Sequence, residues 1–229
     1  MTRYTSCLII CLFALGMVPA SGDENSAQLH QAILDQHNYY RDIAGIKLMK
    51  WNEKLAARAQ LWAVTLKNEN NCKSKHSDKN FRSNQAGFRY IGENLYWRYW
   101  SKPFDNSTEY TKDAATKWYE EIRDYQYSPN GICPKRAKKQ AVGHFTQLMW
   151  NDSTNLGCGY AQCDGKTSLI IVCQYGPGGN VNISKTPPFS EAAAKRLNEH
   201  PVNKKFDGLP TCRRMQDIKI NLDIPRPAR

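Results

Sequence analysis

Histidine is the first residue type to test for catalysis in this chain, which contains five histidines. A serine-protease interpretation would pair Ser77 with His76 or His144, but neighbouring residues in sequence do not supply a triad. The chain has no His-Glu-x-x-His helix and no Gly-x-Ser-x-Gly turn, which are typical of zinc proteases and α/β-hydrolases. The glycine-rich stretch 176–179 lacks the Lys-Ser/Thr of a phosphate loop and is better explained as a turn after a strand. These patterns argue against an enzyme.

Two other groups of side chains could do chemistry of a different kind. His37 and Arg41 lie one helical turn apart, and we expect them to bond backbone and loop groups in a structural role. The segment 96–104 holds five aromatic residues in nine positions. Trp97, Tyr99 and Phe104 have the spacing aromatic-x-aromatic-x4-aromatic within it. We expect a loop here, whose rings either bind an apolar ligand or pack beneath the loop as core.

The first 22 residues are predicted to be a secretory signal peptide. Arg3 gives a positive start, residues 7–18 form an apolar stretch, and small residues offer a cleavage site at Val18-Pro19-Ala20. The apolar run is shorter than the roughly 20 residues needed to span a bilayer. Secretion predicts disulfides among the six remaining cysteines, and spacing alone does not choose their pairing; these are Cys72, Cys133, Cys158, Cys163, Cys173 and Cys212.

Surface modification and charge also fit an extracellular protein. Sequons begin at Asn106, Asn151 and Asn182, and we expect at least one to be glycosylated. The formal net charge is +11, which favours an anionic glycan or membrane surface as partner over nucleic acid in this compartment. The one dense basic run, at 135–139, is interpreted as a solvated loop.

The elements that must position these residues are helices followed by a hairpin, which indicates an α+β fold. Helical spacing predicts one helix over 26–44 that ends near Gly45, and a second that is capped by Asn52. A third helix would be capped by Thr111 or Asp113. Further elements are helices over 143–150 and 190–198, strands over 155–163 and 168–175 joined by the turn at 164–166, and loops over 68–90 and 126–140.

Four segments, in order along the chain, resemble the signature motifs of the CAP superfamily (cysteine-rich secretory proteins, antigen 5, pathogenesis-related proteins). The longest are Gly143-His-Phe-Thr-Gln-Leu-Met-Trp150 and Ile170-Ile-Val-Cys-Gln-Tyr-Gly-Pro-Gly-Gly-Asn180. The others are His37-Asn-Tyr-Tyr-Arg41 and Gly92-Glu-Asn-Leu95. The polar tail and the sequons resemble those of helminth venom allergen-like members. The resemblance implies a three-layer α-β-α sandwich over 26–183, followed by a C-terminal extension over 184–229 that Cys212 ties down.

The resemblance also implies a cavity with two histidines and two glutamates. The matching residues are His76, Glu93, Glu121 and His144, with Glu120 as a rival for the third position. Neutral imidazoles bind Zn²⁺, and carboxylates orient them. Two histidines fall short of the three protein ligands usual in catalytic zinc sites. We therefore expect a structural network that binds a divalent metal weakly and requires no cofactor.

Disulfide pairing is likewise implied by the resemblance. Plant relatives imply the bridges Cys72–Cys158 and Cys163–Cys173. The remaining family bridge cannot form, because Val142 stands where the family has a cysteine. That leaves Cys133 with Cys212, or else two free thiols, which an oxidising compartment disfavours.

In function, the resemblance implies a secreted, non-enzymatic lipid-binding protein that acts outside the cell, plausibly between host and parasite. In sterol-binding members the aromatic loop contacts the sterol, and its spacing is called a caveolin-binding motif. Trp97, Tyr99 and Phe104 match it. Some members hold a fatty acid between two long helices, which here match 26–44 and 111–125. The alternatives are a protein that acts on a host receptor or on immunity and, less favoured, a metal-dependent hydrolase. The sequence does not indicate an oligomeric state.

Overall fold

The structure is a computed structural model that describes residues 21–70, 72–105, 107–125, 127–129, 142–183 and 185–201. Residues 1–20 of the predicted signal segment, Asn106, Cys133, the basic run 135–139 and Cys212 lie outside the described residues. Within the described part, no helix combines the length and the apolarity needed to cross a bilayer.

A four-stranded sheet forms the middle layer, with the order β1-β5-β6-β4. The short strand β1 (Lys50–Trp51) runs parallel to β5 (Asn155–Cys163), and β6 (Ser168–Gly176) pairs antiparallel with both β5 and β4 (Gly92–Tyr99). All nine residues of β6 are buried, as expected for a central strand with near-continuous apolar sequence. The predicted hairpin is therefore confirmed, its second strand being one residue longer than predicted.

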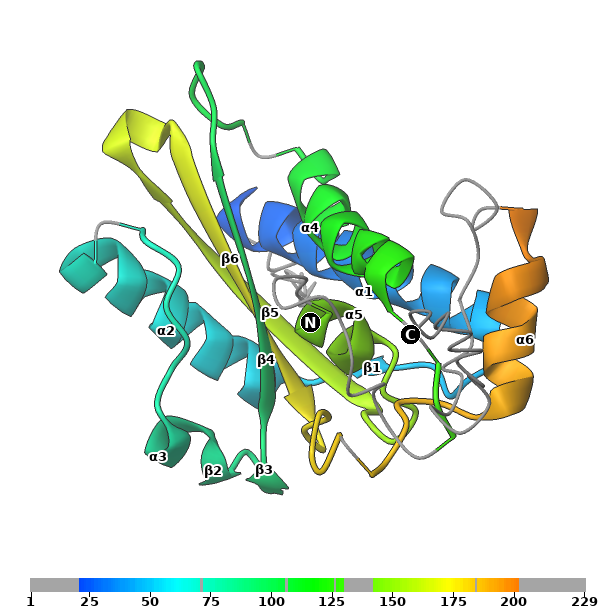
Figure 1. Cartoon of the computed structure of the whole chain (residues 1–229). Coiled ribbons are helices and arrows are strands. Elements are labelled where there is room, and N and C mark those ends of the chain that lie inside the picture. Colours follow the sequence, from blue (N-terminus) through cyan, green and yellow to red (C-terminus); the bar gives the residue numbers. More distant parts are fainter. Residues whose placement is uncertain are drawn as a thin grey trace, which may run out of the picture.

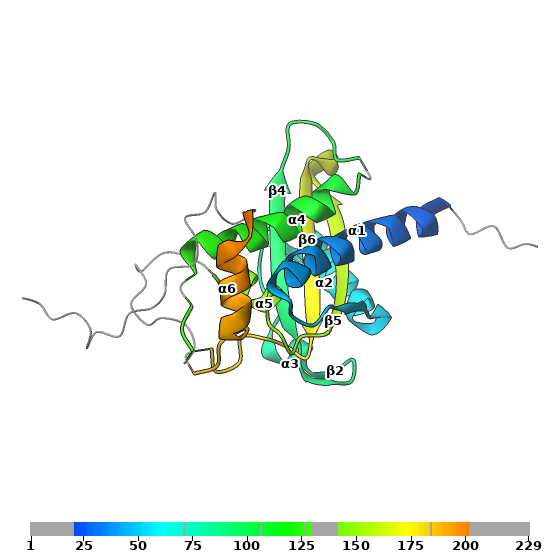
Figure 2. The same cartoon turned by 90° about the vertical axis from the view of Figure 1, so that its right-hand side faces the viewer.

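Helices cover both faces of this sheet, so the three-layer α-β-α sandwich is confirmed (Figure 1, Figure 2). One face carries α2 (Glu53–Asn70), which packs on β5 and β6. The other carries α1 (Ser21–Ala44), α4 (Glu109–Glu120) and α5 (Gly143–Leu148), and α6 (Glu191–Glu199) packs beside α1.

Glycines in β5 explain how closely α2 lies on the sheet. A Cβ added at Gly157 would collide with the backbone of Ala56, and one at Gly159 with the backbone of Gln60. Helix and strand therefore meet backbone to backbone, which only glycine permits. Behind this contact, a small core cluster on the α2 side includes Leu66, Ile170 and Val172.

The larger core cluster lies on the opposite face and includes α6. Phe189, Ala193, Ala194 and Leu197 are buried in it beside Phe145. Ser190 caps α6 by accepting a hydrogen bond from the Ala193 amide, as the predicted helix start requires. The described part of the predicted extension thus shares one core with the rest of the chain.

Several predicted helix limits are confirmed, but α1 begins at Ser21, five residues before its predicted start and within the segment 1–22 predicted as signal peptide. Gly45 adopts a left-handed conformation (φ 64°) directly after α1, and the Asn52 side chain accepts a hydrogen bond from the Leu55 amide at the start of α2. The predicted start of the third helix was wrong. It begins at Glu109 rather than beyond Thr111, and Asp113 instead pairs with Arg98 of β4.

Two segments predicted as loops contain regular structure. Residues 68–90 include the end of α2, a short helix α3 (Lys79–Arg82) and the two-stranded ribbon of β2 (Ser83–Gln85) and β3 (Phe88–Tyr90). The first four residues of the aromatic segment 96–104 belong to β4. Short 3-10 turns follow α4 as η1 (Glu121–Asp124) and join β5 to β6 as η2 (Asp164–Lys166).

Candidate functional site

His76 and Glu93 form the first of two histidine–glutamate pairs. The Nδ1 atom of His76 lies 2.9 Å from Oε1 of Glu93, whose side chain is fully buried on β4. Ser77 donates to the same carboxylate from its amide (2.9 Å) and its hydroxyl (2.7 Å), and Gln174 donates from Nε2 (3.1 Å). Burial by itself raises the pKa of Glu93, but the hydrogen bonds from His76, Ser77 and Gln174 outweigh it and hold the pKa below its usual value.

His144 and Glu121 form the second pair, at the start of α5. Their side chains approach to 2.6 Å between Nδ1 and Oε1. The other carboxylate oxygen of Glu121 accepts hydrogen bonds from the backbone amides of His144 (3.0 Å) and Phe145 (3.1 Å), so Glu121 caps this short helix from a distant segment. The rival, Glu120, instead contacts Lys117 and Arg123 on the helix surface.

The four residues do not form a single metal site. No three His, Cys, Asp or Glu side chains come together as metal ligands among the described residues. Each imidazole uses Nδ1 on a carboxylate, and both carboxylates accept several further hydrogen bonds. The carboxylates thus act as orienting partners, and only the two Nε2 atoms remain for an ion. This donor set does not fit a catalytic zinc centre, which needs three protein ligands.

A buried network joins this site to the core of the protein. Asn94 donates to the carbonyl of His144 (3.0 Å) and to the hydroxyl of Tyr175 (3.1 Å), which in turn lies 2.9 Å from Nε2 of His37. Arg41 is fully buried and donates to the carbonyls of Lys47, Leu148, Trp150 and Ser153 at 2.6 to 3.0 Å. The structural role predicted for His37 and Arg41 is confirmed.

Ser77 and Gln174 were missed by sequence reasoning. Both are buried, and together they supply three of the four hydrogen bonds to Glu93. Ser77 was considered only as a protease residue, and Gln174 only as one letter of the motif 170–180. The strand register places Gln174 opposite Glu93, and the hydrogen bonds from Ser77 show that it shares this partner.

The aromatic segment divides between surface and core. Trp97 is 49% exposed and Tyr99 61% exposed, although both lie on a strand. Phe104 is only 4% exposed and packs edge-on against Tyr110, with ring centroids 4.6 Å apart. Of the three residues with the predicted spacing, therefore, two are available to an external ligand and one packs as core.

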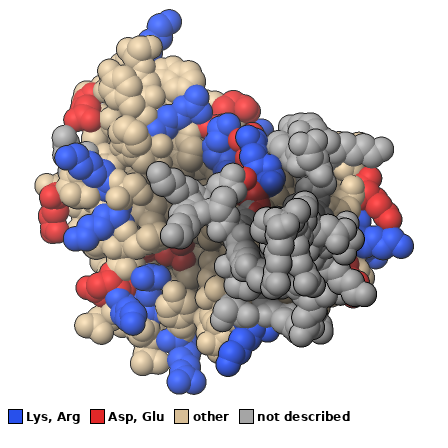
Figure 3. Space-filling model, viewed as in Figure 1, with Lys and Arg blue, Asp and Glu red and all other residues tan. Residues whose placement is uncertain are grey.

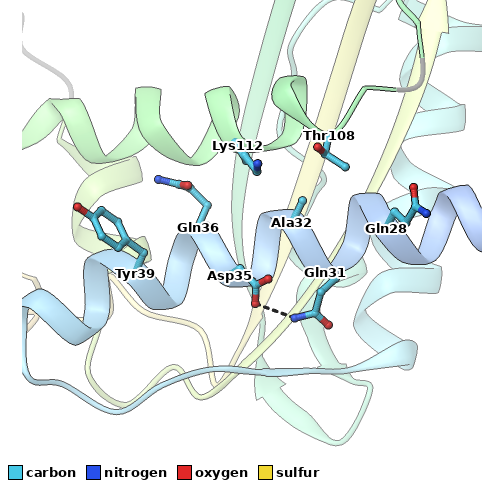
Figure 4. A pocket seen from close by; sticks show the side chains of 8 residues that line it. All are labelled: Gln28, Gln31, Ala32, Asp35, Gln36, Tyr39, Thr108 and Lys112. Carbon is cyan, nitrogen blue, oxygen red and sulfur yellow. Dashed lines mark hydrogen bonds between the residues drawn. The ribbon is translucent and has the colours of Figure 1, made fainter.

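A groove runs between α1 and α4, the helix pair expected to hold a fatty acid. Its volume is about 470 Å³. Tyr39 is its largest side chain, and the other lining residues are mostly amides and charged groups: Gln28, Gln31, Ala32, Asp35, Gln36, Thr108 and Lys112 (Figure 4). Deeper between the helices, Tyr40 stacks on Tyr119 with ring centroids 3.8 Å apart. Most of these side chains end in polar groups, although the larger part of the surface that the groove exposes is apolar.

The disulfides differ from those that the resemblance implied. The bridges are Cys72–Cys163 and Cys158–Cys173, with Cα–Cα distances of 6.1 and 4.1 Å. The β5–β6 register explains the second, because it places Cys158 directly opposite Cys173. Cys163 faces Ser168 in the same register. Cys173 lies five residues further along β6, roughly 17 Å away, which no disulfide can span.

Two of the three sequon asparagines are described. Asn182 is exposed in a turn with a positive φ of 51°. Asn151 is half-buried, and its side chain contacts the Lys47 amide and Asp152. Asn182 thus has the more open surroundings for a glycan.

Comparisons with known proteins agree with this architecture. Residues 34–175 match the model of the family described as "Cysteine-rich secretory protein family". Human cysteine-rich secretory protein 2 is 32% identical over 199 residues, which cover 80% of this chain and 74% of that protein. The solved structure of BmVAL-1 superposes with a TM-score of 0.58 at 28% identity, over 71% of this chain and 82% of that one. The structure of venom allergen-like protein 4 of Schistosoma mansoni superposes with a TM-score of 0.53 at 25% identity. The match covers 73% of this chain and 97% of that one.

Proposed function

Because this chain belongs to the cysteine-rich secretory protein (CAP) family, we propose that it is a secreted, non-enzymatic protein that binds sterol through Trp97 and Tyr99. The observation that carries the proposal is the exposure of these two rings, at 49% and 61%, on a strand of the main sheet. Covering the large apolar surface of an exposed tryptophan or tyrosine with a ligand is favourable, because that surface is removed from water. Flat rings also suit the flat, rigid surface of a sterol.

Phe104 supports this site from inside the protein. It packs between Trp100 and Tyr110, and so it holds the chain that follows β4. We therefore assign ligand contact to Trp97 and Tyr99, and anchoring to Phe104. The groove between α1 and α4 combines polar side-chain ends with apolar surface and does not single out a fatty acid, so the proposal is limited to sterol.

The two histidine–glutamate pairs support a scaffold rather than a hydrolytic centre. Each glutamate fixes backbone as well as imidazole, at Ser77 and at the start of α5. With only Nε2 of His76 and His144 left for an ion, metal binding would be weak and of no use for activating water. A metal-dependent hydrolase is therefore not proposed.

Direct binding of radiolabelled cholesterol to the purified protein tests the proposal. We expect saturable binding that the Trp97→Ala/Tyr99→Ala variant loses. Tyr39→Ala is the matched control, because Tyr39 is similarly exposed (48%) but lies on α1. Retained binding in the double variant would refute the assigned site. No binding by any folded form would refute the sterol function and favour a receptor or immune partner.

A further inference from the structure

Three exposed aromatic side chains form a ridge at one end of the sheet, where β4 is an edge strand. The aromatic ridge consists of Trp97, Tyr99 and Trp100, which are 49%, 61% and 38% exposed. Successive side chains of a strand point to opposite faces. Trp97 and Tyr99 therefore share the face of Leu95, which packs in the α2-side core, and Trp100 lies on the other face. The ridge thus presents aromatic surface on both sides.

The backbone of the ridge is held in place. Tyr99 pairs with Ser168 at the β5–β6 turn, and the Trp100 amide donates to the carbonyl of Thr167 (2.8 Å). The Arg98 guanidinium lies over the Trp100 ring at 4.2 Å and pairs with Asp113 of α4. The ridge and the β5–β6 turn lie at the same end of the sheet (Figure 1).

Lysines flank the ridge on the α2 side. The segment after α2 is fixed at one end by the Cys72–Cys163 bridge near the β5–β6 turn, and at the other by Ser77 on Glu93. In the strand register Cys163 and Tyr99 both pair with Ser168, so this segment extends from the level of Tyr99 back to that of Glu93. It carries Lys73 and Lys75, both exposed.

Lys102, also exposed, follows the ridge directly. None of these three lysines forms an ion pair with an acidic side chain in the described part of the chain. The carboxylates nearest to these lysines in sequence are Glu69, Asp78 and Asp105; Asp78 accepts from the Phe81 amide and Asp105 from the Ser107 amide, while Glu69 is exposed at the end of α2. Across the coloured part of the face in Figure 3, its upper end included, Lys and Arg lie among acidic groups.

We propose that the aromatic ridge docks the protein on the surface of an anionic lipid membrane. Tryptophan and tyrosine favour the boundary between headgroups and acyl chains, where one part of the ring is apolar and the other wet. Lysines beside them are attracted to anionic headgroups. The inference rests on the proposed function because two rings of the ridge are also the proposed sterol contacts. Docking itself requires no sterol.

Flotation with vesicles that contain no cholesterol tests the inference. We expect the protein to float with vesicles of phosphatidylcholine and phosphatidylserine, and more weakly with phosphatidylcholine alone. The Trp97→Ala/Tyr99→Ala/Trp100→Ala variant should bind at least about tenfold more weakly, since three large apolar contacts are lost. Tyr39→Ala should bind like the unaltered protein. Lys73→Gln/Lys75→Gln/Lys102→Gln should lose the preference for phosphatidylserine.

The outcomes separate this inference from the sterol function. Binding only to vesicles that contain cholesterol would overturn membrane docking and leave sterol binding intact. Flotation that is unchanged in the folded aromatic variant would overturn the assigned surface. Docking without saturable cholesterol binding in solution would support the inference and refute the sterol function. Circular dichroism of each variant excludes unfolding as the cause of lost binding.

Discussion

Mild acid should destabilise this protein because His37 is buried in its neutral form. The imidazole has no exposed surface, and its Nδ1 atom lies 2.7 Å from the carbonyl of Ile33, to which it donates. Its Nε2 atom then accepts from the hydroxyl of Tyr175. Burial lowers the pKa of His37 to about 4; the hydrogen bond to Ile33 opposes this shift, and the charge of Arg41 adds to it.

The sign of the effect follows from where the proton binds. In the unfolded chain the pKa of His37 takes its ordinary value of 6.5. Between this value and about 4, the unfolded chain binds a proton that the folded protein excludes, so the free energy of unfolding falls as the pH falls. With these two pKa values, the free energy of unfolding falls by about 2 kcal/mol between pH 7 and pH 5. Its dependence on pH approaches ~1.4 kcal/mol per pH unit within this range.

Urea unfolding at pH 7, 6 and 5, with disulfides intact and tryptophan fluorescence as the signal, measures this loss. The matched variant is His37→Gln, whose amide can still donate to Ile33 and does not titrate. It should be less stable at pH 7 but should lack most of the fall between pH 7 and pH 5. The lowered pKa of Glu93 affects stability only below its ordinary value of 4.5, outside this range. An equal fall in both proteins would refute the reasoning about His37.

Three further predictions concern the core and the bridges. Arg41→Leu leaves five backbone carbonyls without their donor and should cost at least ~3 kcal/mol in urea unfolding; a loss below ~1 kcal/mol would show that water replaces the guanidinium. Phe104→Ala should cost ~3–5 kcal/mol and Trp97→Ala less than ~1 kcal/mol, and equal losses would contradict their different burial. Mass spectrometry of peptides from the non-reduced protein should recover Cys72–Cys163 and Cys158–Cys173, and a linked Cys163–Cys173 pair would contradict the β5–β6 register.

Local sequence patterns predicted the elements whose signals are local. The β5–β6 hairpin was found to within a residue because an apolar run borders a turn at Asp164-Gly165. The end of α1 and the start of α2 were found through Gly45 and Asn52. In contrast, β4 begins with the polar residues Glu93 and Asn94, which are buried by bonds to distant groups. Neither alternation nor an apolar run marks it as a strand.

The candidate site was predicted in its members but not in its arrangement. The family resemblance identified His76, Glu93, Glu121 and His144 as candidates. The sequence could not show that they form two separate histidine–glutamate pairs. The implied disulfide pairing was wrong for the same reason, since pairing depends on which residues the strand register places opposite one another. Exposure of Trp97 and burial of Phe104 likewise depend on packing around the edge strand.

The position of β6 has a consequence for how the chain folds. β6 lies between β5 and β4 and is the last strand of the described residues, so neither neighbour has its main hydrogen-bonding partner before residue 176 is available. Gly92 pairs with Tyr175, far along the chain, and such non-local contacts slow folding. The apolar surfaces of the α2 and β4 segments therefore stay exposed to water until β6 has been synthesised. We expect the sheet to form only once β6 is available, and the chain to be most prone to aggregation before that point.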